Sequence, residues 1–169
     1  MGGAVERARR ARTLLERLGS RVPGISSYLQ RELYREVDEA LRHHLAAGLD
    51  GARREVAAAM ASLSLAQAVQ LHRLNRVHKE LDGLASRLRA AGSGYAGLFD
   101  AFKVREEQLE QLWELDLSCA EDVEALLEAA RRRAEGWELH IEELLERLRL
   151  AIDRRPQVVQ GLLHDGGSS

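Results

Sequence analysis

Residues 92–118 read GSGYAGLFDAFKVREEQLEQLWELDLS, and this stretch reverses the chain between two helical patterns. Three of its first six residues are glycine, which tolerates positive φ and therefore predicts a tight loop. Both phenylalanines of the protein, Phe99 and Phe102, follow closely, and Tyr95 lies within the loop. We expect Tyr95, Phe99 and Phe102 to form a buried aromatic plug at one end of a helical bundle.

The composition on either side of this loop is typical of an all-α protein. The chain has 169 residues, of which 45% are hydrophobic, 31% charged and only 4% aromatic, with two prolines. Alanine, leucine, arginine and glutamate are abundant, and all four favour helices. We predict an elongated antiparallel helical bundle with coiled-coil-like packing. Its expected parts are a basic amphipathic helix over residues 1–20, a bundle domain over 21–163 and a disordered tail over 164–169.

Apolar residues recur every three or four positions in three long segments, which predicts three long helices. Ser27 with Gln30, and Ser64 with Gln67, have the spacing of a capping box, so helices are expected to start there. The short link between the first two segments predicts antiparallel neighbours. The predicted long helices cover residues 27–62, 64–91 and 99–133.

Glycines and a proline set the remaining boundaries. The apolar repeat continues across Gly48 and Gly51, which predicts an unbroken helix that a neighbouring helix approaches closely there. Ser118 with Glu121 also resembles a helix start, but the repeat again continues, so a continuous helix is preferred. A soft break is expected near residues 135–136, before a shorter fourth helix. Arg155-Pro156 is expected to end or kink that helix.

The N-terminal segment has a narrow stripe of alanine and leucine surrounded by arginine. Residues 1–21 contain six arginines and two glutamates, a net charge of +4, whereas residues 100–130 have a net charge of −8. Isolated helices of this length are marginal in water. We therefore expect this helix to dock on the acidic helix, with an anionic membrane surface and nucleic acid as the alternative acceptors. The candidate interaction residues are Arg7, Arg9, Arg10 and Arg12.

Two charged residues interrupt the apolar stripe of the acidic helix. Arg105 and Asp116 lie eleven residues apart on this stripe, too far to pair with each other. A buried charge requires a partner, so each is predicted to fix helix register through a residue of another helix. The candidate partners are Asp38 or Glu80 for Arg105, and Arg87 or His78 for Asp116.

The sequence carries no recognisable pattern for catalysis or cofactor binding. Its six histidines and one cysteine lack the spacing of zinc or carboxylate-bridged di-iron sites. No phosphate-binding loop or nucleophile with a neighbouring base is evident. Cys119 occupies an apolar helical position and is expected to be a buried thiol. We therefore predict no catalytic residue, no metal and no cofactor.

Three segments, residues 22–28, 31–42 and 94–107, resemble a family of uncharacterised bacterial helical proteins. The shared features are a Pro-Gly-x-x-x-Tyr start, an Arg/Asp-rich helix and a Gly-Tyr-x-Gly-x-Phe-Asp-Ala block. Ser27 replaces a glycine of the family pattern, and Leu98 replaces an aromatic residue. The resemblance covers roughly residues 21–130 and implies a bacterial cytoplasmic helical protein. It implies no activity, only an association with stomatin-like and other membrane-organising proteins.

These observations favour a non-catalytic interaction or scaffold protein that acts through self-association and partner helices. The alternative is a membrane-surface accessory that places its basic N-terminal helix on anionic lipid at the inner face of the membrane. Nucleic-acid binding is disfavoured because the basic segment is small and has no aromatic residue for stacking. Apolar runs are too short for a membrane span or a signal peptide, so a cytoplasmic location is expected.

Overall fold

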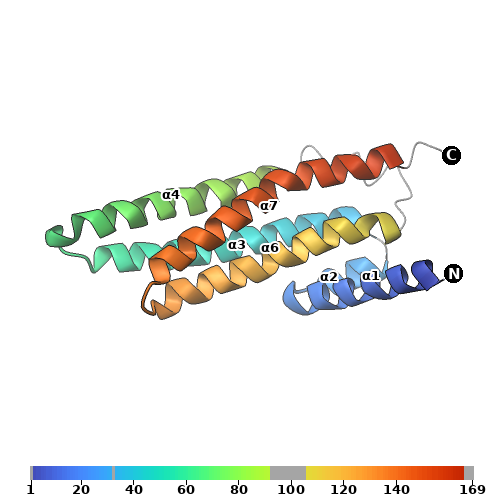
Figure 1. Ribbon diagram of the computed structural model, residues 1–169, viewed down its shortest axis with the longest axis horizontal. Helices are drawn as coiled ribbons and strands as arrows, with labels where there is room; N and C mark the ends of the chain where they lie inside the picture. Colours follow the sequence, from blue (N-terminus) through green and yellow to red (C-terminus); the bar gives the residue numbers. More distant parts are fainter. Residues whose placement is uncertain (1, 32, 92–105, 166–169) are drawn as a thin grey trace.

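The computed structural model describes residues 2–31, 33–91 and 106–165, and all the regular structure among them is helical (Figure 1). The side chains of residues 106–109 and 162–165 are not described. The fold is thus an elongated all-α bundle, as predicted. Its helices are α1 (Gly2–Arg21), α2 (Ile25–Gln30), α3 (Tyr34–Ala61), the 3-10 turn η1 (Leu65–Gln67), α4 (Ala68–Ala90), α6 (Glu106–Arg132) and α7 (Trp137–Asp165).

Two antiparallel hairpins, α3–α4 and α6–α7, lie side by side and form the four-helix core. Helix α3 packs along α6, and α4 packs along α7, each pair running in the same direction (Figure 1). Helices α1 and α2 lie outside this core, with α1 against α6 and α2 against α3. With 29 residues, α7 is the longest of the described helices, so the expectation of a shorter fourth helix was wrong.

A repeat in the sequence matches the pairing of α3 with α6. Residues 36–38 read Glu-Val-Asp and residues 114–116 read Glu-Leu-Asp, 78 positions later. At the same separation, residues 49–54 read LDGARR and residues 127–132 read LEAARR. The two helices therefore occupy equivalent places in the two hairpins. This equivalence sets Asp38 and Asp116 at the same level of two facing helices.

Close contact between α3 and α6 depends on the glycines of α3. A Cβ atom at Gly48 would lie 2.4 Å from Cγ1 of Val123, and one at Gly51 would lie 3.3 Å from Cδ1 of Leu127. Both glycines lie inside the continuous helix α3. The predicted unbroken helix and close approach are confirmed, and so is the continuity of α6 across Ser118.

The first long helix does not begin where its sequence suggests. Ser27 lies within the separate short helix α2, where its Oγ donates a hydrogen bond to the carbonyl of Gly24. The helix α3 starts only at Tyr34, after Leu33 adopts a non-helical conformation. Full burial of Ile25 beside α1 holds α2 as a separate turn, so the capping box at Ser27 was wrong. The capping box of Ser64 and Gln67 is confirmed.

The boundary before α7 differs from expectation, and α7 does not end at Pro156. The chain reverses completely between α6 and α7, because Arg133 and Gly136 adopt φ values of 49° and 77°. This is a hairpin turn rather than the soft break that was predicted. Pro156 lies inside α7, which continues to Asp165. The turns beyond the proline bury Val159 completely, and this burial compensates for the backbone hydrogen bond that proline cannot donate.

The aromatic plug falls on a part of the chain outside the described residues. Tyr95, Phe99 and Phe102, together with Arg105, all lie between residues 92 and 105. The one aromatic contact among the described residues joins Tyr34 of α3 to the buried Trp113 of α6, with ring centroids 6.3 Å apart.

Candidate functional site

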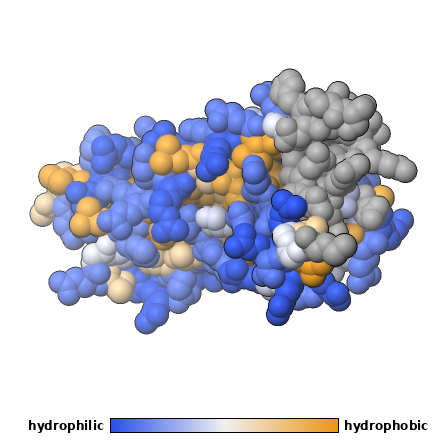
Figure 2. Space-filling view, turned by 45° about the vertical axis from the view of Figure 1, so that its right-hand side comes forward, coloured by the Kyte–Doolittle hydropathy of each residue, from blue (hydrophilic) through white to orange (hydrophobic). Residues whose placement is uncertain are grey.

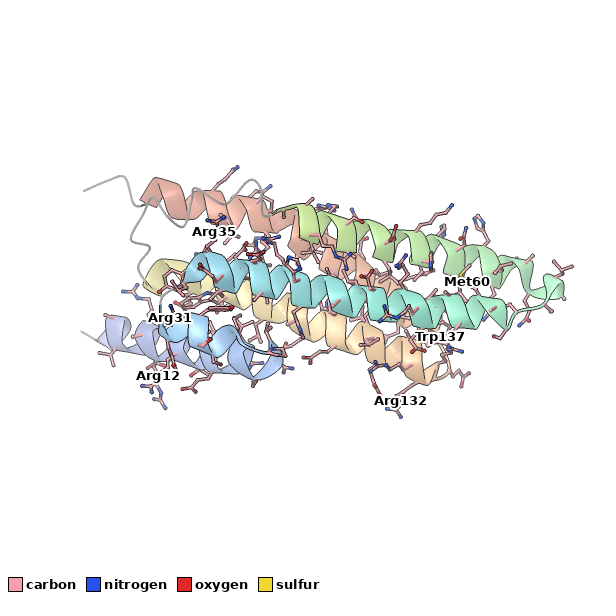
Figure 3. The ribbon with its side chains drawn as sticks, turned by 180° about the vertical axis from the view of Figure 1, so that it is seen from behind. Arg12, Arg31, Arg35, Met60, Arg132 and Trp137 are labelled. Atoms are coloured by element: carbon pink, nitrogen blue, oxygen red, sulfur yellow. The ribbon has the colours of Figure 1, made fainter. Side chains whose placement is uncertain are left out.

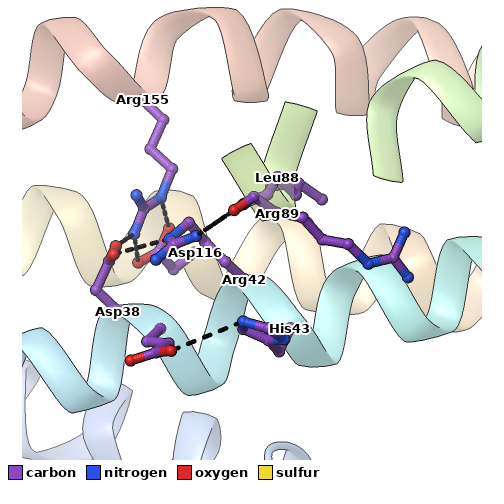
Figure 4. Close-up of polar contacts among 8 residues, drawn as sticks. Asp38, Arg42, His43, Leu88, Arg89, Asp116 and Arg155 are labelled. Atoms are coloured by element: carbon purple, nitrogen blue, oxygen red, sulfur yellow. Dashed lines mark hydrogen bonds and ion pairs between the residues drawn. The ribbon is translucent and has the colours of Figure 1, made fainter. Parts of the chain in front are cut away.

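Four charged side chains meet inside the bundle, where α3, α6 and α7 converge (Figure 4). Arg155 of α7 lies between Asp38 of α3 and Asp116 of α6. Its Nε and Nη2 donate to the two oxygens of Asp116 at 2.9 and 3.2 Å, and Nη2 also donates to Asp38 at 2.5 Å. A single guanidinium therefore links three helices through the two aspartates of the repeat.

Arg42 extends this cluster to the fourth helix. Its Nε donates to the second oxygen of Asp38 at 2.9 Å. Its Nη1 donates to the carbonyls of Leu88 and Arg89 at 2.9 and 3.3 Å. Both carbonyls belong to the last turn of α4, where helical carbonyls have no partner of their own and where a cation is favourable. Arg42 thus caps α4 from within the bundle.

The cluster of Asp38, Arg42, Asp116 and Arg155 is buried and balanced in charge. No side chain of the four is more than 6% exposed. Burial raises the pKa of the Asp116 carboxyl above its usual value, although Arg155 offsets part of the rise. Burial alone would lower the pKa of Arg155, but Asp116 and Asp38 outweigh it and raise that pKa.

The pKa of Asp116 is dominated by burial, whereas the pKa of Arg155 is dominated by its ion pairs. Arg155 has two carboxylates within hydrogen-bonding distance, whereas Asp116 faces one guanidinium and the like charge of Asp38. We take the fully ionised cluster as the native form, because a guanidinium stays protonated throughout the normal pH range. With both arginines permanently charged, the cluster suits alignment of the four helices better than proton transfer.

The sequence identified Asp116 correctly as a charge that needs a partner from another helix. The expected partners, Arg87 and His78, were wrong, because the partner is Arg155. Arg155 was assigned to a helix end beside Pro156, which concealed that it lies on the buried face of α7. The 78-residue repeat is the signal that could have joined Asp38 to Asp116.

A cavity of about 340 Å³ opens beside the cluster, between the end of α4 and residues 152–156 in the middle of α7. Three arginines line it, but each already has a partner. Arg42 and Arg155 belong to the buried cluster, and Arg87 donates to Asp153 at 2.5 Å. The cavity therefore offers a mainly apolar wall, because protein groups already bind all three of its guanidinium groups.

A second charged contact joins the N-terminal helix to the bundle. Arg17 of α1 bonds to Glu121 of α6 at 2.6 Å, and Arg21 bonds to Glu124 at 2.6 Å. The apolar stripe of α1 is covered at the same time, since Leu18 is only 1% exposed. Docking of the basic helix on the acidic helix is therefore confirmed.

The arginines at the start of α1 lie on its exposed surface. Arg12 points away from the bundle and approaches Glu16 of its own helix at 3.4 Å (Figure 3). Beside them, α1 and α6 form an open groove of about 360 Å³. The four predicted interaction residues, all exposed, are Arg7, Arg9, Arg10 and Arg12.

The described residues carry two further findings on chemistry. Cys119 is buried, as expected, and burial together with Asp116 raises the pKa of its thiol to about 12. Within the described ranges, histidine, cysteine and carboxylate side chains form no group that could hold a metal. No helix among these residues has both the length and the apolar character needed to cross a membrane.

No family model, curated protein or solved structure matches this chain. The family resemblance in the sequence stays a prediction.

Proposed function

We propose that this protein is a non-catalytic interaction or scaffold protein in which the acidic outer face of α6 receives an amphipathic helix. The observation that supports this is α1 itself, a basic helix that lies outside the four-helix core and is held on α6 by matched charges. The pairs of Arg17 and Arg21 are partly exposed, and pairs of this kind contribute only about 0.2–1 kcal/mol each. The ion pairs by themselves are thus weak, whereas the buried Ala11 and Leu18 hold α1 in place until a competing amphipathic helix covers the same face.

Exchange of α1 accounts for both kinds of partner. If α1 leaves α6, the α1 of a second copy fits the same face with the same ion pairs, which gives self-association by domain swapping. A basic amphipathic helix of another protein fits the face by the same chemistry. The buried cluster of Asp38, Arg42, Asp116 and Arg155 supports this role by holding the four-helix core rigid while α1 exchanges.

A peptide of residues 2–21 tests the proposal directly. Fluorescence anisotropy should show that the labelled peptide binds a chain lacking residues 1–21, with an affinity that falls as salt is raised. A matched chain that also carries Glu121→Lys and Glu124→Lys should not bind. Equal binding to both chains, or binding to neither, would contradict the proposed role of α6.

The alternative function is a membrane-surface accessory that uses α1 at the inner face of the membrane. The exposure of Arg7, Arg9 and Arg10 favours it, because arginines near an anionic surface contribute about 1 kcal/mol each. The buried Ala11 and Leu18 oppose it, because α1 must leave α6 before its apolar stripe can contact lipid. Salt-resistant binding of the full chain to anionic vesicles, lost on deletion of residues 1–20, would favour this alternative.

A further inference from the structure

The end of the bundle formed by α3 and α4 has no charge. Residues 57–71 contain no Asp, Glu, Lys or Arg, although such residues make up 31% of the chain. We call this segment the uncharged tip. It comprises the end of α3, the turn with η1 and the start of α4, and Figure 1 shows that it extends beyond the α6–α7 turn.

Large apolar side chains on this tip face solvent. Leu65 is 94% exposed and Val69 is 84% exposed, the two highest values among the exposed large hydrophobic residues of the described chain. On the outer face of α3, Ala57, Ala58 and Ala61 are exposed as well. In the space-filling view, small hydrophobic areas lie at this end of the molecule, and a larger one lies over its middle (Figure 2). The apolar surface therefore surrounds a projecting tip on both of its helices and does not form one flat face.

Several backbone amides of the turn already donate hydrogen bonds within the protein. The amides of Ser62 and Leu63 donate to the last turn of α3, and the amide of Gln67 donates to the carbonyl of Ser64. The amide of Ser64 donates to the side chain of Gln67 at 3.0 Å. Backbone groups that are already bonded remove the main cost of placing a turn in a less polar environment.

Exposed arginines lie behind the tip on α3 and α6. Arg54 on α3, with Arg131 and Arg132 at the end of α6, is exposed, and Figure 3 shows Arg132 pointing outward. The seven helical steps from Arg54 to Ala61 span roughly 10 Å, which is similar to the depth to which an amphipathic segment enters a bilayer interface. Two acidic residues lie among these arginines: Glu55 pairs with Arg133, and the exposed Glu128 approaches Arg132 at 3.9 Å.

We infer that the uncharged tip inserts into the interface of an anionic membrane, with Arg54, Arg131 and Arg132 at the level of the lipid headgroups. Lipid can surround a projecting tip that is apolar on both helices, whereas the flat face of a protein partner would cover one side of it only. The charge behind the tip matches anionic headgroups. This contact goes beyond the proposed binding of helices on α6 and uses a separate surface, because α1 lies on α6 away from the tip.

Flotation of the full chain with vesicles tests this inference. Vesicles of equal parts phosphatidylglycerol and phosphatidylcholine should bind the protein, and pure phosphatidylcholine should bind it weakly. The double variant Leu65→Gln with Val69→Gln should reduce binding by at least about tenfold, because it removes the apolar contact. Leu150→Gln is the matched control, since Leu150 is 55% exposed on α7, and it should leave binding unchanged.

Two further arms separate the tip from other surfaces. A dye attached through Leu65→Cys should become blue-shifted on anionic vesicles, and the same dye attached through Leu150→Cys should not; buried Cys119 should leave the label selective. Loss of binding with Arg9→Gln and Arg10→Gln, but not with the tip variant, would overturn the inference in favour of α1. Absence of vesicle binding, or equal binding to neutral and anionic vesicles, would also overturn it and point to a protein partner for the tip.

Discussion

Removal of Asp116 tests the role of the buried cluster. Asp116→Leu takes away the carboxylate that accepts two hydrogen bonds from Arg155 and leaves Asp38 to serve both arginines. The cluster then changes from two positive and two negative charges to an excess of one buried positive charge. Breaking a buried pair in this way costs about 3–5 kcal/mol of unfolding free energy.

Urea unfolding followed by circular dichroism at 222 nm measures this loss. The matched control is the double variant Asp116→Leu with Arg155→Met, which restores charge balance and keeps the pair of Asp38 with Arg42. It should recover most of the loss, because apolar replacement of a whole buried pair is often neutral or stabilising. A single variant as stable as the wild type, or a double variant less stable than the single one, would refute the reasoning.

Two other predictions concern single sites. Gly48→Ala should lower the free energy of unfolding in urea by roughly 1–3 kcal/mol, because the new methyl group meets Val123. The control Gly83→Ala has open space around it and should be neutral or stabilising. Equal effects of the two changes would mean that α3 and α6 are not in close contact. Cys119 should resist alkylation in the native protein at pH 8 and should react in urea. A pKa of about 12 lowers its thiolate population about a thousandfold relative to a thiol with the ordinary pKa of 9.0. Rapid labelling of the native protein would show that the thiol is accessible.

Features that depend on local pattern could be predicted from the sequence. The capping box at Ser64 and the continuity of α3 across Gly48 follow from residues within a few turns of each other. Docking of α1 followed from a strong charge difference between two segments. Ser27 failed as a helix start because burial of Ile25, a tertiary effect, holds α2 apart from α3.

The buried cluster could not be predicted without the fold. Arg155 lies 39 residues from Asp116 and 117 residues from Asp38, and no local spacing relates them. Pro156 also suggested a helix end at that point, because proline cannot donate a backbone hydrogen bond. Packing of the turns that follow overrides this preference and places Arg155 inside the bundle.

Hydrogen exchange of α1 in the full chain tests most directly the claim that α6 receives a basic helix by charge. The amides of α1 should be protected in the wild type. Exchange should accelerate when Arg17→Glu and Arg21→Glu reverse the charge of α1, and protection should return when Glu121→Arg and Glu124→Arg are added. The account would be contradicted if the amides of α1 exchange freely in the wild type, or if their exchange rates do not change in the charge-reversed variants.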